Sequence, residues 1–355
     1  MSELSSVVIG AGQAGLSTSY HLSRLGIDHI VLDADDAPGG AWQHRWDALT
    51  MTDVHGVAEL PGSQPPPRTH ARANLAVPAY FAEYERAHDL PVRRPVRVRR
   101  VTDDAGTLVV HADAGTWRTR TLVNATGTWS RPFIPHYPGA ESFVGEQIHT
   151  VDYPGPEHFV GMRTLVVGGG ASAVQFLGAL APITDTLWVT RREPVWRTSR
   201  FTPEAGAAAV ALVEQRVARG LPPESVVSVT GLMLREQEQE AARLGAYDAR
   251  RPMFERIEPH GVRWPDGSYE PVDVILWATG FRPAIGHLAP LHLRTPAGGI
   301  QLDRNGRGTT AVADERVQLV GYGPSASTIG ANRAGRTAAA GVRRYLRSQD
   351  AIRVA

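Results

Sequence analysis

The first residues of the chain combine a short uncharged run with three closely spaced glycines. Residues 4–9 lead directly into Gly10, Gly12 and Gly15, which have the spacing G-x-G-x-x-G, and a stretch with an apolar stripe of helical period follows. This order predicts a strand, a tight turn and a helix: Gly10 permits the turn, Gly12 lets a ligand approach the backbone, and Gly15 lets the helix lie close to the strand. The N–H groups and positive end of such a helix favour a pyrophosphate, so the segment predicts a dinucleotide site.

A second apolar run ends in an acidic residue at the separation from the loop that dinucleotide-binding folds use. Residues 30–32 are Ile-Val-Leu, and Asp33 follows them. A carboxylate at this position accepts a hydrogen bond from a ribose 2′-hydroxyl and repels a 2′-phosphate. The first unit is therefore predicted to bind a dinucleotide without a 2′-phosphate. The alternative is an ordinary glycine-rich turn between a strand and a helix.

The same pattern recurs near the middle of the chain. Residues 163–167 lead into Gly168, Gly170 and Ala173, with the spacing G-x-G-x-x-A, and a helical stretch follows. Two such loops are far more specific than one, because the probabilities of chance matches multiply.

The strand after the second helix ends in two arginines, where the first unit has its acid. Arg191 and Arg192 follow the mostly apolar stretch 186–190. A guanidinium group binds phosphate oxygens in a bidentate manner, so the pair favours a 2′-phosphate and hence NADPH. A solvated arginine pair at a strand end is the alternative.

Each loop has a later partner strand that ends in Ala-Thr-Gly. These turns consist of Ala125, Thr126 and Gly127 in the first unit, and of Ala278, Thr279 and Gly280 in the second. The chain thus repeats an entire nucleotide-binding unit, which predicts an α/β fold with two Rossmann-like dinucleotide-binding domains.

Composition narrows the classes of function. The 355 residues include 37 Lys or Arg and 36 Asp or Glu, a balance that argues against a protein that binds nucleic acid or a membrane surface. There is no cysteine, which excludes disulfide and thiolate chemistry, so any redox reaction needs a bound cofactor. The N-terminus lacks a basic segment, and no apolar run approaches the ~20 residues of a membrane span. We therefore expect a cytoplasmic enzyme without a membrane span or a metal site.

Several further elements are expected from local patterns. Residues 78–88 are predicted to form a helix that starts at Pro78, and residues 206–219 and 226–244 are predicted to be helical. Hairpins are expected at Asp113-Ala114-Gly115 and Pro265-Asp266-Gly267. A last helix is expected to end near Leu346.

The segment before the second loop carries a more specific pattern. It reads F-x-G-x-x-x-H-x-x-x-Y, with Phe143, Gly145, His149 and Tyr153 at the fixed positions, and Gly39-Gly40-x-Trp42 follows the first acid. With these motifs the chain resembles, over nearly its whole length, the class B flavin-dependent monooxygenases: the flavin-containing monooxygenases, the N-hydroxylating monooxygenases and the Baeyer–Villiger enzymes. The tyrosine at the last position of the pattern resembles the residue that the flavin-containing monooxygenases have there. The short chain looks like a compact bacterial form of these enzymes.

The resemblance implies a discontinuous FAD-binding domain, residues 1–155 and 285–355, into which an NAD(P)H-binding domain, residues 156–284, is inserted. It assigns to FAD Gly10, Gly12, Gly15, Asp33, Gly40, Trp42, Val98, Ala125, Thr126 and Gly127. It assigns to the nicotinamide cofactor Gly168, Gly170, Ser172, Ala173, Arg191 and Arg192, beside the second turn of Ala278, Thr279 and Gly280. The relatives often have Asn before the serine of the second loop, where this chain has Ala171, and NADH remains open as an alternative to NADPH.

The resemblance also implies the reaction. NAD(P)H reduces FAD, O2 adds at the flavin C4a atom, and the resulting C4a-(hydro)peroxyflavin transfers one oxygen atom to a small organic substrate, a sulfide or amine in preference to a ketone. No side-chain nucleophile is needed, and Asp53 and Arg45 are the candidate catalytic residues. His149 lies in a linker, which favours a structural or hinge role. The alternatives are an NAD(P)H-dependent flavin reductase or electron-transfer enzyme, and a dinucleotide-binding redox sensor without turnover; a homodimer is left open.

Overall fold

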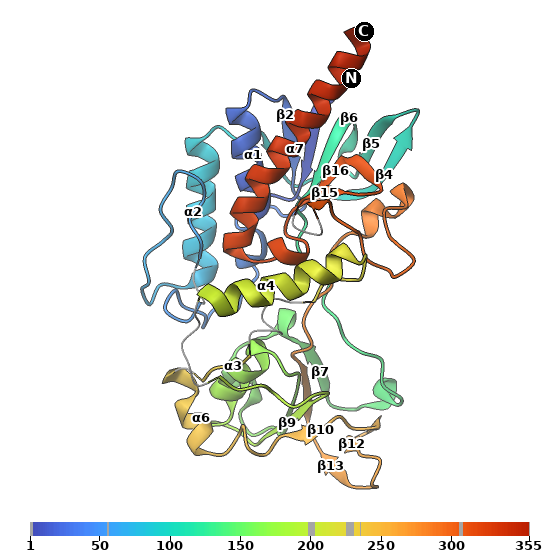
Figure 1. Ribbon diagram of the computed structural model, residues 1–355. Coiled ribbons are helices and arrows are strands. Elements are labelled where there is room, and N and C mark those ends of the chain that lie inside the picture. Colours follow the sequence, from blue (N-terminus) through green and yellow to red (C-terminus); the bar gives the residue numbers. More distant parts are fainter. Residues whose placement is uncertain are drawn as a thin grey trace. The chain divides into compact units, whose positions relative to one another are not determined.

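The computed structural model describes residues 3–54, 57–197, 203–224, 231–234, 236–304 and 308–354 (Figure 1). The chain divides into two compact units. The first contains Met1–Ser130, Ala207–Val226 and Pro283–Ala355, and the second contains Arg131–Gly206 and Val227–Arg282.

The sheet of the first unit has the order β15-β16-β6-β1-β2-β3, extended by β4 and β5. Its strands are β1 (Leu4–Ile9), β2 (His29–Leu32), β3 (Val92–Arg93), β4 (Val98–Asp104), β5 (Thr107–Ala112), β6 (Gly115–Asn124), β15 (Thr310–Ala311) and β16 (Asp314–Leu319). The central strands are parallel, with Ile9 opposite both Leu32 and Asn124. Because these three strands end at one edge of the sheet, the residues that follow them are brought together there.

Helices complete the first unit: α1 (Gln13–Arg24), η1 (Gly40–Trp42), α2 (Ala73–Ala87), α4 (Pro203–Ala218), η6 (Gly286–Leu291), η8 (Gly323–Ser325) and α7 (Thr328–Val354). Of α4, only the part from Ala207 onward belongs to this unit. α1 and α7 lie side by side (Figure 1), and a Cβ atom at Gly335 of α7 would lie 2.6 Å from the Ser17 hydroxyl of α1. Leu16, Val31, Phe81 and Val123 are fully buried in the core that α1, α2, α7 and the sheet share. This packing holds the start of α1 at the edge of the sheet.

The second unit has a parallel sheet of order β10-β9-β8-β14-β7 and a small antiparallel sheet, β11-β12-β13. The strands are β7 (Glu146–His149), β8 (Thr164–Val167), β9 (Thr186–Thr190), β10 (Arg251–Pro252), β11 (Arg256–Glu258), β12 (Gly261–Arg263), β13 (Tyr269–Pro271) and β14 (Val274–Trp277). The helices are η2 (Ala140–Ser142), η3 (Thr150–Asp152), η4 (Pro156–Phe159), α3 (Ala171–Leu180), η5 (Glu236–Glu238) and α6 (Gln239–Arg243). The predicted α/β fold with two parallel-sheet units is confirmed, and both expected hairpins form, as β5–β6 and β12–β13.

Three helix predictions need correction. The last helix, expected to end near Leu346, continues to Val354. The helix expected from Pro78 begins five residues earlier, at Ala73, and contains the proline. The proline ring lies against Gly39, so tertiary packing outweighs the loss of one backbone hydrogen bond. The helix expected over 226–244 is wrong for the described residues 231–234: Leu232 exchanges backbone hydrogen bonds with Val195 and Arg197, and helix occurs only from Glu236. Residues 225–230 and 235 lie outside the described part of the chain.

The compact units differ in their bounds from the predicted domains. The second unit begins at Arg131 rather than at residue 156, because β7 pairs with β14, and Trp277 lies opposite His149. Residues 207–226 group with the first unit, where the Gly220 carbonyl accepts a hydrogen bond of 2.6 Å from Thr295. The assignment of one cofactor to each domain stays a prediction.

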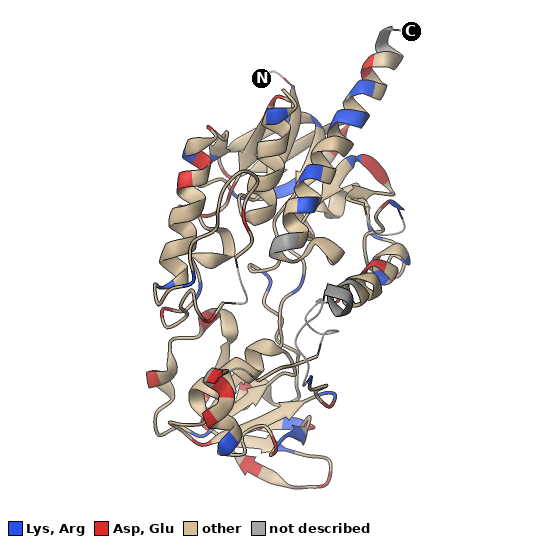
Figure 2. Cartoon of the chain, turned by 60° about the vertical axis from the view of Figure 1, so that its left-hand side comes forward, with Lys and Arg blue, Asp and Glu red and all other residues tan. Residues whose placement is uncertain are grey.

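Acidic and basic residues are interspersed on both units, with a series of exposed arginines along α7 (Figure 2). Among the described residues, no helix is both long and apolar enough to cross a membrane. Within the same ranges, no cluster of three or more His, Cys, Asp or Glu side chains has the arrangement of a metal site.

Candidate cofactor-binding sites

The first glycine loop follows β1 and opens α1. Gly10 has a φ of +99°, and a Cβ atom there would lie 2.7 Å from the carbonyl oxygen of Ala125. A Cβ atom at Gly15 would collide with the carbonyl oxygen of Gly10. Two of the three glycines are therefore required by the close approach of the chain to itself.

Gly12 differs from its neighbours because no atom in the described part of the chain requires a glycine there. Its φ of −79° suits any residue, and the nearest atom to a Cβ would be the Cα of Gly40, at 4.0 Å. Within the described residues, α1 has no side-chain cap and no acid in its first turn. Open space above the backbone, together with uncapped N–H groups at a helix N-terminus, fits a pyrophosphate.

The Gly39-Gly40 pair brings η1 against this loop. Gly40 has a φ of +50°, and a Cβ atom there would lie 2.9 Å from the Cα of Gly12. Gly39 has a φ of +129° and contacts Pro78. The pair thus allows η1, which ends at Trp42, to pack on the first glycine loop.

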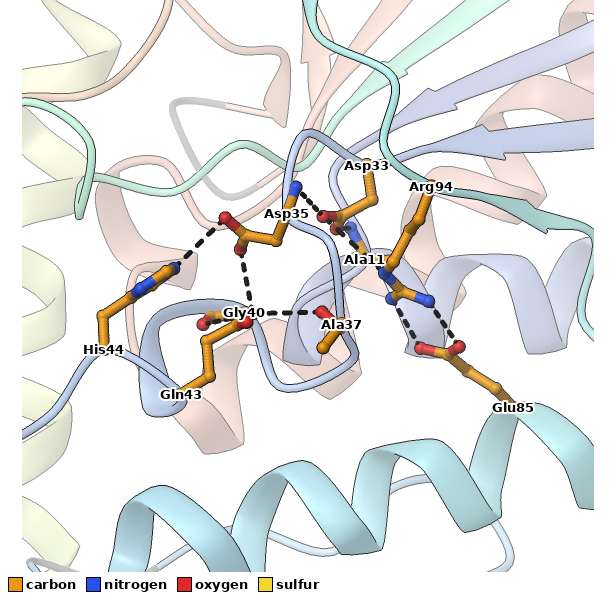
Figure 3. Close-up of polar contacts among 9 residues, drawn as sticks. All are labelled: Ala11, Asp33, Asp35, Ala37, Gly40, Gln43, His44, Glu85 and Arg94. Carbon is orange, nitrogen blue, oxygen red and sulfur yellow. Dashed lines mark hydrogen bonds and ion pairs between the residues drawn. The ribbon is translucent and has the colours of Figure 1, made fainter.

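Asp33 lies beside the same loop (Figure 3), and only 7% of its side chain is exposed. Its carboxylate accepts hydrogen bonds from the backbone N–H groups of Ala11 and, at 2.9 Å, Asp35. The Arg94 Nε atom lies 3.8 Å from the carboxylate, and both terminal nitrogens of Arg94 donate at 2.7 Å to Glu85. Burial raises the pKa of Asp33, whereas the backbone hydrogen bonds and Arg94 oppose that rise.

A second group of hydrogen bonds joins η1 to Asp35 (Figure 3). Gln43 donates at 3.0 Å to the Asp35 carboxylate and at 3.3 Å to the Gly40 carbonyl, and His44 contacts the same carboxylate at 3.1 Å. These hydrogen bonds therefore connect the segment after Asp33 to the segment after Gly40.

The second loop shows the same division of roles among its residues. A Cβ atom at Gly168, where φ is +148°, would collide with the Ala278 carbonyl, whereas no atom of the described chain lies within 4 Å of such a position at Gly170. Ala173 replaces the third glycine and is fully buried, and Ser172 is exposed. In the part of the chain that the structure describes, α3 also begins without a side-chain cap or an acid in its first turn. The second loop therefore also fits a pyrophosphate.

The two Ala-Thr-Gly turns have a structural explanation. Each alanine carbonyl lies where the first glycine of a loop must lack a side chain. The threonine hydroxyls bind each turn to a segment far away in the sequence: Thr126 donates at 2.6 Å to the Ala284 carbonyl, and Thr279 donates to the Phe133 carbonyl. The repeat seen in the sequence thus reflects a repeated contact between a loop and its partner strand.

Arg191 and Arg192 follow β9 and are both exposed. Across the described ranges, neither side chain forms an ion pair with an acid. Both cations are therefore available to a phosphate, although their role in binding remains a prediction.

The pattern that begins at Phe143 is part of the second unit. His149 is buried and accepts a hydrogen bond from the Val151 N–H at Nδ1, so its Nε2–H donates to the Gly280 carbonyl at 3.1 Å. Burial lowers the pKa of His149, which keeps the ring neutral. Tyr153 packs on Phe159 and Phe176, and a Cβ atom at Gly145 would collide with the Asp273 carbonyl. These contacts agree with a structural role for the pattern.

The remaining candidate residues have different surroundings. The Asp53 carboxylate accepts a hydrogen bond of 3.1 Å from the Thr50 N–H and so stabilises its own turn. Val98 begins β4, two residues after Val96 donates to the Asp33 carbonyl. Arg45 lies 4.3 Å from the ring centre of Trp129 and 5.7 Å from that of Trp42. The catalytic roles of Asp53 and Arg45 remain predictions.

The sequence did not indicate that His287 would contact the first turn. The His287 Nε2 atom lies 2.7 Å from the Oδ1 atom of Asn124, the residue that precedes Ala125 and the turn. Burial lowers the pKa of His287 to about 4 from 6.5. Between these values the unfolded chain takes up a proton that the folded protein does not, so stability should fall as the pH decreases through this window.

We therefore expect His287→Asn to weaken the pH dependence of stability. The melting temperature of the wild type should drop more than that of the variant between about pH 7 and about pH 5, by the equivalent of about 2 kcal/mol. Thermal unfolding at both pH values measures this difference. Parallel melting curves for the two proteins at both pH values would contradict it.

Comparison with known proteins places the chain in a family. Residues 7–231 match the family described as pyridine nucleotide-disulphide oxidoreductase. A flavin-containing monooxygenase from Stenotrophomonas maltophilia is 36% identical, with a TM-score of 0.82, and the match covers 98% of this chain and 100% of that chain. The chain therefore belongs to the pyridine nucleotide-disulphide oxidoreductase family and, within it, to the class B flavin-dependent monooxygenases. FAD and NADPH are the cofactors of this class.

More distant relatives match in part. An uncharacterized oxidoreductase CzcO from Bacillus velezensis is 27% identical over 54% of this chain and 59% of its own length. The indole-3-pyruvate monooxygenase YUCCA1 from Oryza sativa subsp. japonica is 28% identical over 78% of this chain and 76% of its own length. The chain spans about half the length of the first curated relatives it matches.

Proposed function

We propose that the first unit binds FAD, that the second binds NADPH, and that the protein uses both to insert one oxygen atom of O2 into a small organic substrate. The observation that carries this proposal is the pair Gly12 and Gly170: each opens a helix with free space above its backbone among the described residues, where no protein contact requires a glycine. NADPH supplies two electrons, one oxygen atom enters the substrate, and the other leaves as water.

The chain's own residues divide this work. Gly10, Gly12 and Gly15 shape the first loop, Asp33 accepts a ribose hydroxyl, and Gly40 brings Trp42 toward the same site. Gly168, Gly170 and Ala173 shape the second loop, and Arg191 and Arg192 bind the 2′-phosphate. Bound FAD supplies the oxygen-activating chemistry, while the protein orients both cofactors and limits the access of water.

A sulfide or an amine is the proposed substrate, with a ketone as the second choice. The names of the relatives support an oxygenase but differ in substrate: one is an indole-3-pyruvate monooxygenase, one a Baeyer-Villiger monooxygenase, and one a senecionine N-oxygenase from Tyria jacobaeae. A disulfide reductase that relies on a cysteine pair is not an option for this chain, which has no cysteine.

The test is to purify the protein, identify its bound flavin, and follow NADPH oxidation, O2 consumption and product together. A monooxygenase forms oxygenated product in step with both. NADPH oxidation that needs an added electron acceptor would favour the flavin reductase, and slow flavin reduction without turnover would favour the redox sensor.

The arginine pair gives a prediction on cofactor choice. Replacing Arg191 and Arg192 together by Gln should raise the Michaelis constant for NADPH about tenfold or more, because charge-assisted bonds to the 2′-phosphate are lost. The constant for NADH, which has no such phosphate, should change much less. Steady-state kinetics with both cofactors measures the ratio, and equal losses for the two would contradict a role at the 2′-phosphate.

A further inference from the structure

Arg45 is a cation in aromatic surroundings. Its guanidinium carbon lies 4.3 Å from the ring centre of Trp129 and 5.7 Å from that of Trp42. The residue is half-buried, but its Nε atom is fully enclosed and makes no hydrogen bond within the described structure. Across the ranges described, no acidic side chain forms an ion pair with it. A partly enclosed charge without a counter-charge is costly, which points to a ligand.

Another stacked arginine of this chain shows the usual arrangement. Arg251 lies 3.6 Å from the ring centre of Trp264, and it donates at 3.0 Å to Glu270 and at 2.9 Å to Ser268. Its charge is thus compensated within the protein. Both arginines stack on an indole, so stacking does not distinguish Arg45 from Arg251. Arg45 differs because it forms no ion pair with an acidic side chain in the described part of the chain.

The segment that carries Arg45 is fixed next to the first glycine loop. Gly40 packs on Gly12, and Asn74 donates at 2.9 Å to the Arg45 carbonyl and at 2.8 Å to Asp47. Trp129 follows two residues after the Ala-Thr-Gly turn of the same unit. The cation is therefore held in place beside the proposed FAD site.

We propose that Arg45 is a specificity-determining residue that binds the carboxylate of an anionic substrate. The inference rests on the proposed function, and it narrows the substrate to sulfides or ketones that bear a carboxylate. The planar guanidinium matches the two oxygens of a carboxylate, and the two neighbouring indoles, Trp129 and Trp42, suit a flat apolar substrate body. A protonated amine would be repelled by the uncompensated charge. Although burial lowers the pKa of Arg45 to about 10, the group stays charged at neutral pH.

The experiment compares three aryl methyl sulfides that differ in one substituent: 4-(methylthio)benzoate, its methyl ester, and 4-(methylthio)benzylamine. The wild-type holoenzyme should prefer the benzoate to the ester in kcat/KM by about tenfold or more, with the amine poorest. Arg45→Met should abolish most of that preference, Arg45→Lys should keep part of it, and the control Arg251→Met should leave the ratio unchanged. A wild-type ratio near one, or a ratio that Arg45→Met does not alter, would overturn the proposal.

Two further measurements separate the sources of failure. The dissociation constant of FAD is measured for each variant: if Arg45→Met loses FAD, the residue serves the cofactor and the proposal is overturned. Binding of 4-(methylthio)benzoate is followed by the change in the flavin spectrum, without NADPH. Binding that depends on Arg45 in a protein that oxygenates no substrate would support the carboxylate site while refuting the proposed reaction.

Discussion

Alanine at Gly12 should give a folded protein that no longer retains FAD, and alanine at Gly170 should give a yellow protein that NADPH no longer reduces. Both positions have ordinary backbone angles and room for a Cβ atom: across the ranges that the structure describes, the nearest atom at Gly12 is 4.0 Å away and none lies within 4 Å at Gly170. Among the described residues there is thus nothing for the added methyl group to clash with, and we expect it to clash with a ligand that approaches the backbone. Since a misplaced pyrophosphate loses several hydrogen bonds to backbone N–H groups, each affinity should fall about a hundredfold.

Gly15 provides the contrasting variant. A Cβ atom there would collide with the Gly10 carbonyl, so Gly15→Ala should lower the stability of the protein itself. Melting temperature, bound flavin per chain and the rate of flavin reduction by NADPH measure the three variants together. If Gly12→Ala retained FAD, or if Gly170→Ala were reduced normally, the corresponding loop would not bind its proposed cofactor.

The glycine loops could be predicted from the sequence because their signal is local. A strand, a glycine turn and a helix follow each other directly in both units, over Leu4–Arg24 and over Thr164–Leu180, so spacing alone identified Gly10 and Gly168. The repeat of Ala-Thr-Gly was also visible, but its reason was not. Only the structure shows that the alanine carbonyl lies against the first glycine of the loop.

Other features could not be predicted because they depend on contacts between distant segments. Glu85 and Arg94 lie on α2 and after β3, and nothing in their spacing indicates that they meet beside Asp33. The early start of α2 likewise depends on a contact with another segment, since the Ala73 N–H bonds to the Leu49 carbonyl. The sequence predicted a linker for the pattern beginning at Phe143, whereas the structure has a strand there, β7. This strand was missed because it is only four residues long and pairs with a strand more than a hundred residues away.

Arg94 gives the second large effect that we expect. Arg94→Met removes the cation next to Asp33 and leaves Glu85, whose side chain is only 12% exposed, without its partner. The loss of one member of a buried ion pair should destabilise the protein by about 3 kcal/mol. FAD affinity should also fall about tenfold, since a cation at this distance shifts a carboxyl pKa by about 1–3 units and favours its ionised, hydrogen-bond-accepting form.

The pH dependence follows from the groups that face Asp33. Burial and the neighbouring Asp35 raise the pKa of Asp33, and Arg94 opposes them. FAD binding should weaken as the pH decreases and Asp33 takes up a proton. In Arg94→Met the pKa of Asp33 rises further, so this weakening should begin at a higher pH than in the wild type. Titration of the apoprotein with FAD across the acidic range measures the shift.

Two controls separate positioning of Asp33 from folding. Arg86→Met breaks the pair of Arg86 and Glu83 on the same helix, which is exposed on both sides, and should change neither stability nor FAD affinity appreciably. The double variant Glu85→Met with Arg94→Met leaves no unpaired carboxylate at Glu85, so stability should recover in part. Its FAD affinity should stay low, because Asp33 still lacks the cation. If the double variant bound FAD as tightly as the wild type, Arg94 would act on folding alone, and the ionisation of Asp33 would not depend on it.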